Sequence, residues 1–517
     1  MSSERVSDIL FAMRRKGIKI WTENGQLRYK TAQQALTTED LESLRALRQD
    51  ILTFLEQPAS LYRESRPVPW QLSDRVPLSF PQQYLWELAG LQNHPSMRQV
   101  AAAVRLEGRL DIGCLQQSLQ RLVARHEALR TRIVVVEGVP EQHVDNADAF
   151  TLEILDLASS PDCDRESEAR RLVAQIVHEP VFLATDPLFA ARLIKLDGSC
   201  HVLVVATEHL IADAASIGII WRDLFAGYSQ AIRGQPYSLP EVAVQYPDYA
   251  IWQQSTHCSW VQSNQAYWAQ RLAGARRLHV FAREDVTHPS GMRWATLPVR
   301  FGKTLSRELL EISRIGRTSL VMSVLTAFVA LLSQWCNVAD LVIQFVTRGR
   351  AYPEVNNTVG LFGVPLFVRI ELAEEDTFLD LLGRVTREYT AACEHDHSCR
   401  TAVQMCGAEF GLNPLFNWIP QEFNMNGGSP DCQARSDDAL VLAPFGFAVT
   451  PREGQEWDGE PRIDLSDSKE GVSGAIGYRA DRVAPDTVER FGRSLLLFAQ
   501  KLAREPGSRV RAVGCER

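Results

Sequence analysis

The chain has 517 residues and a net charge of −8, and 45% of its residues are hydrophobic. This length predicts two or more compact domains, and the acidic balance argues against nucleic acid as a general partner. The N-terminus lacks the apolar run of a secretion signal, and no stretch reaches the roughly 18 apolar residues of a membrane span, so we expect a cytoplasmic protein. Ten cysteines without a CxxC pair predict neither a zinc site nor a disulfide framework.

The first 57 residues predict a small module of helix, hairpin and helix. Residues 4–15 have helical spacing, and a second helix is expected from Thr38. Between them, two alternating runs flank Asn24-Gly25, which is the strongest short-range signal for a β-hairpin. Six basic residues lie between positions 14 and 30 against one acidic residue, so the module is basic in an acidic chain.

This module resembles the β-hairpin docking domains at the N-termini of some synthetase subunits. The resemblance implies that residues 1–57 bind a short, acidic linear motif at the end of a carrier-protein subunit. Lys19, Trp21, Arg28 and Lys30 are the candidate docking residues. A solvated basic cap, or protection of the hairpin edge against aggregation, is the alternative. The proline-rich residues 58–77 are interpreted as a linker.

A candidate catalytic segment lies where a strand over residues 202–206 gives way to a helix, for which Ser216 is the expected N-cap. Glu208, His209 and Asp213 fall between the two elements. An imidazole held at the end of a core strand can hold or exchange a proton, so His209 is the candidate catalytic residue. The alternative is a core histidine whose hydrogen bonds are satisfied.

Further motifs lie on both sides of this segment. They are SFPQQYLW (79–86), RHEALRT (125–131), YPDYAIW (246–252), a stretch from 347 to 369, NPLF (413–416), and residues 471–497. In this order they resemble the motifs of the condensation domains of nonribosomal peptide synthetases, over residues 78–507. The HHxxxDG signature of that family matches EHLIADA (208–214), with Glu208 in place of the first His and Ala214 in place of the Gly. We interpret the motif RHEALRT (125–131) as architectural.

The resemblance implies an α/β (α+β) fold of two lobes in a V, each like chloramphenicol acetyltransferase, with a tunnel between them. We place the N-terminal lobe at 78–238 and the C-terminal lobe at 239–517. A strand at 298–301, a long apolar helix at 320–335 and a strand at 341–346 suit such a lobe.

The resemblance also implies the chemistry. A thioester on the phosphopantetheine of a partner carrier protein is the donor, no cofactor is bound by the chain, and His209 deprotonates or orients the acceptor. We expect Asp213 to hold the loop, with Arg350 as its ion-pair partner. Glu208 would raise the pKa of His209 if its carboxylate were close and ionised.

Two further positions belong to the expected acceptor region. Ala214 adds a methyl group where the family has Gly, so it could bend the loop or narrow the acceptor channel. Backbone N–H groups at the start of the Ser216 helix could bind a developing oxyanion. The cluster His395-Asp396-His397 lacks a further partner at ligand spacing, so no metal site is expected there.

No adenylation or carrier domain is recognised, which predicts a free-standing, monomeric condensation enzyme that forms an amide or ester on an amine or hydroxyl acceptor. An aminoacyl group on a second carrier is the alternative acceptor. A cyclisation domain would have an Asp where Glu208 stands, and an epimerisation domain would work beside its own carrier. The altered signature leaves one further alternative, a non-catalytic platform that recruits carrier proteins or tailoring enzymes.

Overall fold

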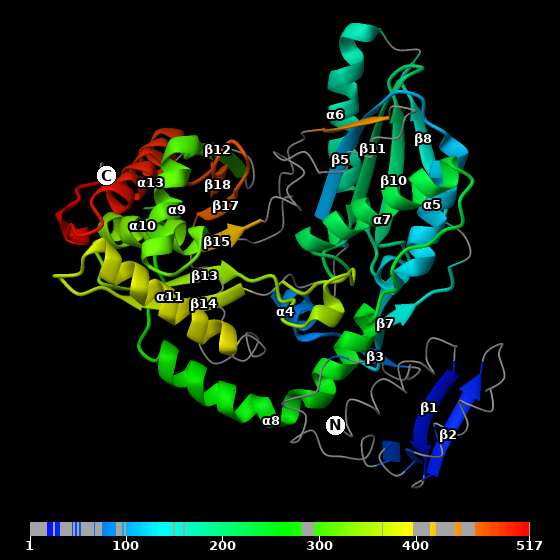
Figure 1. Ribbon diagram of the computed structural model, residues 1–517, viewed down its shortest axis with the longest axis horizontal. Helices are drawn as coiled ribbons and strands as arrows, with labels where there is room; N and C mark the ends of the chain where they lie inside the picture. The colour runs from blue at the N-terminus through cyan, green and yellow to red at the C-terminus, as the bar shows by residue number, and fades with distance from the viewer. Residues whose placement is uncertain are drawn as a thin grey trace.

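The computed structural model contains two lobes that lie side by side (Figure 1). It describes residues 18–23, 26–31, 44, 47–48, 51–52, 67, 75–88, 96–97, 100–147, 150–158, 161–281, 294–363, 365–395, 414–419, 440–445 and 461–515. Helix α8 (Tyr246–Leu272) runs from below the N-terminal lobe towards the C-terminal lobe, and the N-terminal hairpin lies apart from the C-terminal lobe. The two-lobed α/β arrangement predicted from the sequence is therefore present.

The N-terminal lobe is built on a five-stranded sheet. In spatial order its strands are β16 (Val441–Pro444), β5 (Val100–Glu107), β11 (Cys200–Thr207), β10 (Phe189–Lys195) and β8 (Glu153–Asp156). Helices α5 (Ile112–Arg125) and α7 (Ala214–Ile232) pack on one face, and α6 (Asp162–His178) packs on the other. Strand β11 is thus buried on both faces, which explains the unbroken apolar run of its residues 202–206.

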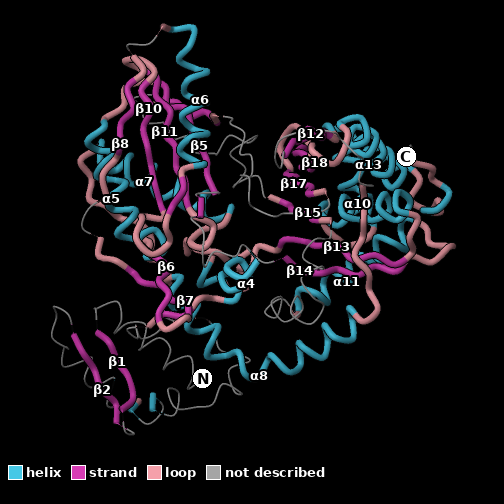
Figure 2. Tube along the Cα trace, turned by 180° about the vertical axis from the view of Figure 1, so that it is seen from behind, coloured by secondary structure: helices cyan, strands magenta, loops and turns pink. Residues whose placement is uncertain are grey.

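The C-terminal lobe is built on a six-stranded sheet. In spatial order its strands are β12 (Trp294–Arg300), β18 (Ser473–Arg479), β17 (Arg462–Ser466), β15 (Leu415–Trp418), β13 (Asp340–Val346) and β14 (Pro365–Glu371). Helices α9 (Gly302–Ile315), α10 (Leu320–Cys336), α11 (Phe378–Glu394) and α13 (Pro485–Arg504) lie on the side of this sheet away from the N-terminal lobe (Figure 2). The predicted strand, helix and strand are confirmed, whereas α9 was not predicted.

Helix α10 is the buried centre of this lobe, with its residues from 322 to 333 in the core. Within the described part of the chain, no single helix is long and apolar enough to cross a membrane. Helices α9 and α10 pass that test only as a pair, and the chain bends by 101° between them.

Segments from the second half of the chain complete the N-terminal lobe. Strand β16 pairs antiparallel with β5, and Phe445 beyond it is buried in the core beneath α6. The loop between β13 and β14 places Val355, Val359 and Leu361 in the core that also contains α5 and α7. The two lobes are therefore joined by packed chain segments as well as by α8.

Smaller elements surround the two sheets. They are β3 (Val76–Pro77), α4 (Phe80–Leu88), β4 (Ser96–Met97), η2 (Glu127–Arg130), β6 (Thr131–Val136), β7 (Val139–Val144), β9 (Pro180–Val181), η3 (Pro353–Val355) and η7 (Val510–Ala512). Strands β3, β7 and β6 form a three-stranded sheet, and β4 pairs with β9. This last pairing matters for the site because Ser96 belongs to β4.

The predicted N-terminal hairpin is confirmed, with β1 (Ile18–Glu23) antiparallel to β2 (Gln26–Thr31). Its register pairs Lys19 with Lys30 and Trp21 with Arg28, so the candidate docking residues occupy neighbouring cross-strand positions. The side chain of Arg28 is exposed. The helix predicted at residues 4–15 lies outside the described residues, as does most of the helix predicted from Thr38.

A glycine in a left-handed conformation shapes the loop that carries Arg350. Gly349 has φ +61°, and a Cβ added there would lie 1.7 Å from the backbone oxygen of Phe362. Gly234, after α7, has nearly the same φ of +62° but open space around it. We expect Gly234→Ala to cost about 1 kcal/mol of stability, and Gly349→Ala about 3 kcal/mol or more because backbone must also move. Urea unfolding of both variants measures this, and equal losses would contradict the close contact.

Candidate active site

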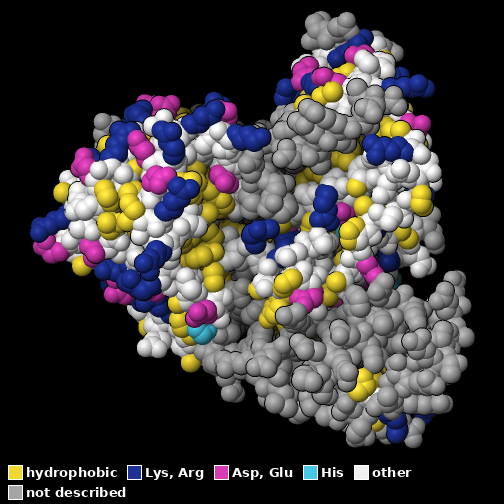
Figure 3. Space-filling view, viewed as in Figure 1, with side chains coloured by type: hydrophobic (Ala, Val, Ile, Leu, Met, Phe, Trp, Pro, Cys, Tyr) yellow, Lys and Arg dark blue, Asp and Glu magenta, His cyan; other side chains and the backbone are white. Residues whose placement is uncertain are grey.

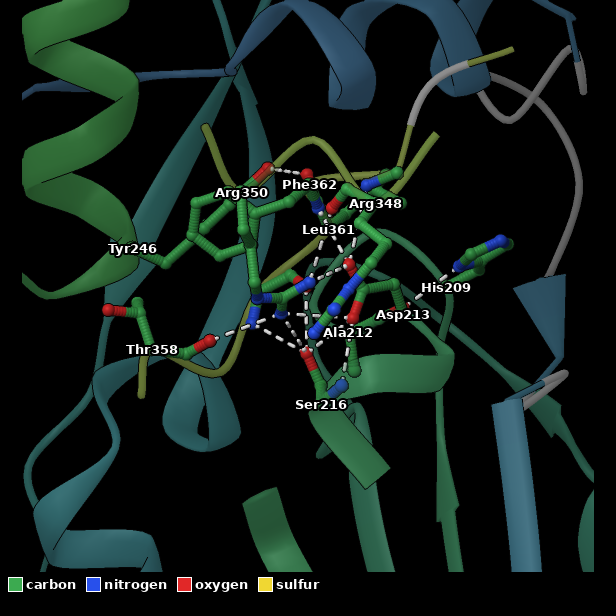
Figure 4. A network of polar contacts seen from close by, with 12 residues as sticks. His209, Ala212, Asp213, Ser216, Tyr246, Arg348, Arg350, Thr358, Leu361 and Phe362 are labelled. Carbon is green, nitrogen blue, oxygen red and sulfur yellow. Dashed lines mark hydrogen bonds and ion pairs between the residues drawn. The ribbon is translucent and has the colours of Figure 1, made fainter. Parts of the chain in front are cut away.

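His209 lies just after β11, and a hydrogen bond to the backbone orients its ring (Figure 4). Its Nδ1 is 2.8 Å from the carbonyl oxygen of Ala212. A carbonyl can only accept, so Nδ1 carries the proton and Nε2 is the unprotonated nitrogen of the neutral ring. His209 as a residue is partly exposed, and Nε2 is the ring nitrogen left to accept a proton.

Burial lowers the pKa of His209 below its ordinary value, and the charge of Arg462 acts in the same direction. The Ala212 carbonyl and the charge of Asp213 oppose this shift without cancelling it. The imidazole is therefore neutral at pH 7. The expectation that Glu208 would raise this pKa is wrong: the pKa is lowered, and Glu208 is not among the groups that shift it.

Glu208 is buried and binds the protein's own backbone and a serine. The Ser96 hydroxyl donates to its Oε1 at 2.7 Å, and the Leu210 amide donates to Oε2. Burial raises the pKa of Glu208 to about 7, because the hydrogen bonds from the Ser96 hydroxyl and from the Leu210 and His209 amides compensate only part of the desolvation. Glu208 thus ties the loop that carries His209 to β4.

We expect Glu208→Gln to change the pH dependence of stability. The folded chain holds this proton to about pH 7 but the unfolded chain only to about 4.5, so the free energy of unfolding falls as pH rises between these values. At pH 8 the variant should be more stable than the unmodified chain by up to about 3 kcal/mol, and near pH 4 the difference should vanish. Urea unfolding across this range tests it, with Glu107→Gln, an exposed position on β5, as the control. Identical pH slopes in both variants would contradict the prediction.

The predicted ion pair between Asp213 and Arg350 is confirmed. Arg350 Nη1 lies 2.7 Å from Asp213 Oδ2 and Nη2 lies 3.1 Å from Oδ1, and both side chains are buried. The amides of Phe362 and Gly363 also donate to Oδ2, at 3.1 and 3.3 Å. Burial alone would raise the pKa of Asp213, but the charge and hydrogen bonds of Arg350 outweigh it and lower the pKa.

The predicted N-cap at Ser216 is wrong, because α7 begins at Ala214 and its N-cap is Asp213. The Asp213 carboxylate accepts hydrogen bonds from both the amide and the hydroxyl of Ser216, each at 2.8 Å. The Ser216 hydroxyl also contacts the backbone of Gly360. Ser216 is therefore engaged inside the protein and its amide is not available to an oxyanion, whereas Ala214 is exposed.

Tyr246 and Phe362 pack around this ion pair. The Tyr246 hydroxyl lies 2.6 Å from Ser79 Oγ and donates to the carbonyl of Leu361. The Arg350 guanidinium lies over the Phe362 ring, 4.4 Å from its centroid. Residues from the first, signature and later motifs thus meet at one place although they are far apart in the chain.

The second motif has the architectural role expected of it. Arg125 Nε and His126 Nε2 both contact Asp223 Oδ2 on α7, at 2.9 and 3.0 Å. Asp223 was not identified from the sequence, because nothing in its local pattern distinguishes it from a surface acid.

His395 does not join the site and stacks on Tyr267 with the ring centroids 3.9 Å apart. Asp396 and His397, considered with it in the sequence, lie outside the described residues. Within the described ranges, no group of three or more His, Cys, Asp or Glu side chains is placed to hold a metal ion.

Comparison with known protein families identifies the family of this chain. The family model of the condensation domain matches residues 72–511, which is most of the chain. The chain belongs to the condensation domain family. A second model, the TubC N-terminal docking domain, matches residues 6–57. The condensation domain and its docking domain therefore occupy the ranges in which the sequence resembled them, and the family binds its substrates through the phosphopantetheine of carrier proteins.

Relatives of this condensation domain are peptide synthetases. It is 31% identical over 458 residues to a component of the linear gramicidin synthase of Brevibacillus parabrevis, covering 86% of this chain and 8% of that protein. It is 30% identical to the phosphinothricin tripeptide synthetase PhsC of Streptomyces viridochromogenes, covering 85% of this chain and 40% of that protein. The chain thus spans well under half the length of these relatives.

Solved structures share the fold. The X-domain from teicoplanin biosynthesis, in complex with OxyB, superposes with a TM-score of 0.72 at 23% identity, over 86% of this chain and 97% of that one. A structure concerned with condensation domain-mediated chain release from the enacyloxin polyketide synthase superposes with a TM-score of 0.65 at 20% identity, over 96% of this chain and 95% of that one. The chloramphenicol-acetyltransferase-like lobes expected for this condensation domain are therefore shown.

Proposed function

We propose that this condensation domain transfers an acyl group from the phosphopantetheine thioester of a carrier protein to an amine or hydroxyl group. The observation that carries the proposal is the hydrogen bond from His209 Nδ1 to Ala212, since it leaves Nε2 unprotonated on a neutral ring. A ring in this state can accept the proton that an attacking amine or alcohol must lose.

The reaction balances without a further reactant. The acceptor nitrogen or oxygen forms a bond to the thioester carbon, the carbon–sulfur bond breaks, and the thiolate leaves. His209 takes the acceptor proton and returns it to the sulfur, so the products are an amide or ester and a free pantetheine thiol. Because the thioester is already activated, positioning of the two reactants contributes most of the acceleration.

Three other residues position the base in this proposal. Asp213 caps α7 and forms an ion pair with Arg350. The next residue, Ala214, is exposed at the start of the helix. Glu208 fixes the loop from its other side through Leu210. These residues act through His209 and are not themselves expected to exchange a proton with the acceptor.

Residues 1–57 are the proposed recruiting module. They belong to a docking-domain family, and the basic positions Lys19, Arg28 and Lys30 lie on the paired strands β1 and β2. We propose that this hairpin binds an acidic C-terminal motif of the donor carrier protein, and that the chain acts as a free-standing monomer.

The test is intact-mass analysis of an octanoyl-loaded carrier protein that ends in an acidic motif. It is incubated with the full chain and a panel of free amines and hydroxyl compounds, and with a second aminoacyl-loaded carrier. Loss of the octanoyl group with formation of the matching amide or ester supports the proposal and identifies the acceptor class. If the carrier binds but no acceptor is acylated faster than in buffer, the chain is a recruitment platform and the catalytic proposal fails.

A further inference from the structure

Gln82 joins the first turn of α4 to the loop that carries His209. Its Nε2 donates a hydrogen bond at 2.8 Å to the carbonyl oxygen of Leu210, the residue that follows His209. Gln82 is fully buried, with 0% of its surface exposed. The surface is notched between the two lobes (Figure 3), but a side chain below the surface cannot contact a substrate that enters there. Gln82 can therefore affect the reaction only through the loop.

The other contacts of the Gln82 side chain fix the orientation of its amide. Ser79, directly before α4, donates its backbone amide to Gln82 Oε1 at 2.9 Å, and the Gln82 backbone amide donates to Ser79 Oγ at 3.3 Å. This reciprocal pair is a capping box. Gln82 Nε2 also donates to Gln142 Oε1 at 3.3 Å. Exchanging Oε1 and Nε2 would set oxygen against the Leu210 carbonyl, so only the orientation present satisfies these partners.

Leu210 is held at both of its backbone polar groups. The Glu208 carboxylate accepts from its amide, and Gln82 donates to its carbonyl. Two residues further along the chain, Ala212 supplies the carbonyl that accepts from His209 Nδ1. The direction of the Leu210 carbonyl thus helps to set the position of the carbonyl that holds the imidazole.

Loss of the Gln82 amide would leave the Leu210 carbonyl buried without the donor that satisfies it. Such a group is costly, so the peptide would rotate towards a new partner. Leu210, Ile211 and Ala212 are each at most 1% exposed, so they are packed together and the rotation would carry the Ala212 carbonyl with it. The His209 ring would then lose the acceptor of its Nδ1 proton and could hold that proton on Nε2 instead.

We propose that Gln82 is a positioning residue that keeps His209 in the tautomer with Nε2 unprotonated. It orients the Leu210 carbonyl and, through the loop, the Ala212 carbonyl that binds Nδ1. This role is separate from capping α4, because the capping box uses only Oε1 of the Gln82 side chain. The inference rests on the proposed acyl transfer for its purpose, although the tautomer can be measured without turnover.

Nitrogen NMR of the histidine rings in the full chain tests the inference at pH 8. Ring nitrogen shifts distinguish the two tautomers, and the His209 signals are those missing from His209→Ala. Gln82→Met keeps the size of the side chain without its polar groups, and it should lower the ratio of the Nδ1–H to the Nε2–H tautomer of His209 by about 5- to 30-fold. Gln253→Met is the matched control and should keep the ratio, because Gln253 is also buried and binds the same helix start, where its Oε1 accepts from the Phe80 amide at 2.7 Å.

A second variant covers the case in which Gln82→Met does not fold, as judged by circular dichroism. Gln82→Glu keeps the capping box, because a carboxylate still accepts from the Ser79 amide. At about pH 9.5, above the pKa of about 8–9 known for buried Glu side chains, the carboxylate cannot donate to Leu210, so the same fall in the tautomer ratio is expected. A ratio within about twofold of the unmodified chain, in whichever variant folds, overturns the inference.

Turnover separates this inference from the acyl transfer itself. With the loaded carrier, Gln82→Met should lower kcat by about 10- to 100-fold and change KM for the acceptor by about threefold or less, because the base is displaced while the substrates still bind. Gln253→Met should keep kcat. If the tautomer ratio falls but no chain transfers the acyl group, the positioning role stands and the catalytic proposal fails. If the unmodified chain transfers the group and Gln82→Met does so with the same kcat, the positioning role is overturned.

Discussion

We expect His209→Ala to lower the proposed acyl transfer by about 10²- to 10⁴-fold, the range found when a positioned general base is removed. The variant changes neither the carrier protein nor the thioester, so the loss should appear in kcat and not in carrier binding. The hydrogen bond from Nδ1 to Ala212 fixes the tautomer of the ring, and the lowered pKa keeps the ring neutral. The substitution removes both.

The pH dependence of the transfer rate is a second test of the role of His209. A general base works when deprotonated, and the pKa of His209 is lowered from about 6.5, so transfer should stay at its plateau below pH 6.5 before it falls in acid. His143→Ala is the control, because His143 is an exposed histidine of the same lobe on β7. Intact-mass analysis of the loaded carrier follows both variants. Transfer by His209→Ala within threefold of the unmodified chain would assign the base elsewhere.

The elements that sequence reasoning predicted correctly are those with strong local signals. Asn24-Gly25 between alternating runs gave the hairpin of β1 and β2, and the apolar residues 202–206 gave β11. The ion pair of Asp213 with Arg350 was also anticipated, as a hypothesis made within the family resemblance and not from a local signal.

The errors arose where a local pattern allows two outcomes and tertiary contacts choose between them. Asp213 and Ser216 are both good N-cap residues. The helix starts after Asp213, and the Ser216 side chain instead bridges Asp213 and the backbone of Gly360. Glu208 is adjacent to His209 in the chain, yet its carboxylate accepts a hydrogen bond from Ser96 on β4, which is 112 residues away in the chain. Neither the choice of N-cap nor the contact of Glu208 can be predicted from the few residues around it in the sequence.

The joining of β16 to the N-terminal sheet could not be predicted for a related reason. Its pairing with β5 connects residues separated by more than half the chain, and a strand edge carries no sequence signal for its partner.

Asp213→Ala should lower the free energy of unfolding by about 3–5 kcal/mol, the second of the two largest effects expected here. The substitution leaves the Arg350 charge buried, with 2% of its side chain exposed, and it removes the acceptor for the amides of Ser216, Phe362 and Gly363. The first of these belongs to α7 and the other two to the loop between β13 and β14, so the loss loosens the contact between them as well as the helix cap.

The double variant Asp213→Ala with Arg350→Met separates buried charge from the lost amide acceptor. Without the guanidinium no unpaired charge remains, so the double variant should recover about 1–3 kcal/mol over Asp213→Ala alone, the remainder being the cost of the unsatisfied amides. Urea unfolding followed by circular dichroism measures all three chains, with Lys501→Ala as the control for an exposed i,i+4 pair, expected to change stability by about 0.5 kcal/mol or less. A double variant no more stable than Asp213→Ala would mean that capping and amide binding, not charge compensation, are why Asp213 is needed. The ion pair would then be a consequence of how α7 begins, and Arg350 could be replaced without loss of the loop that holds His209.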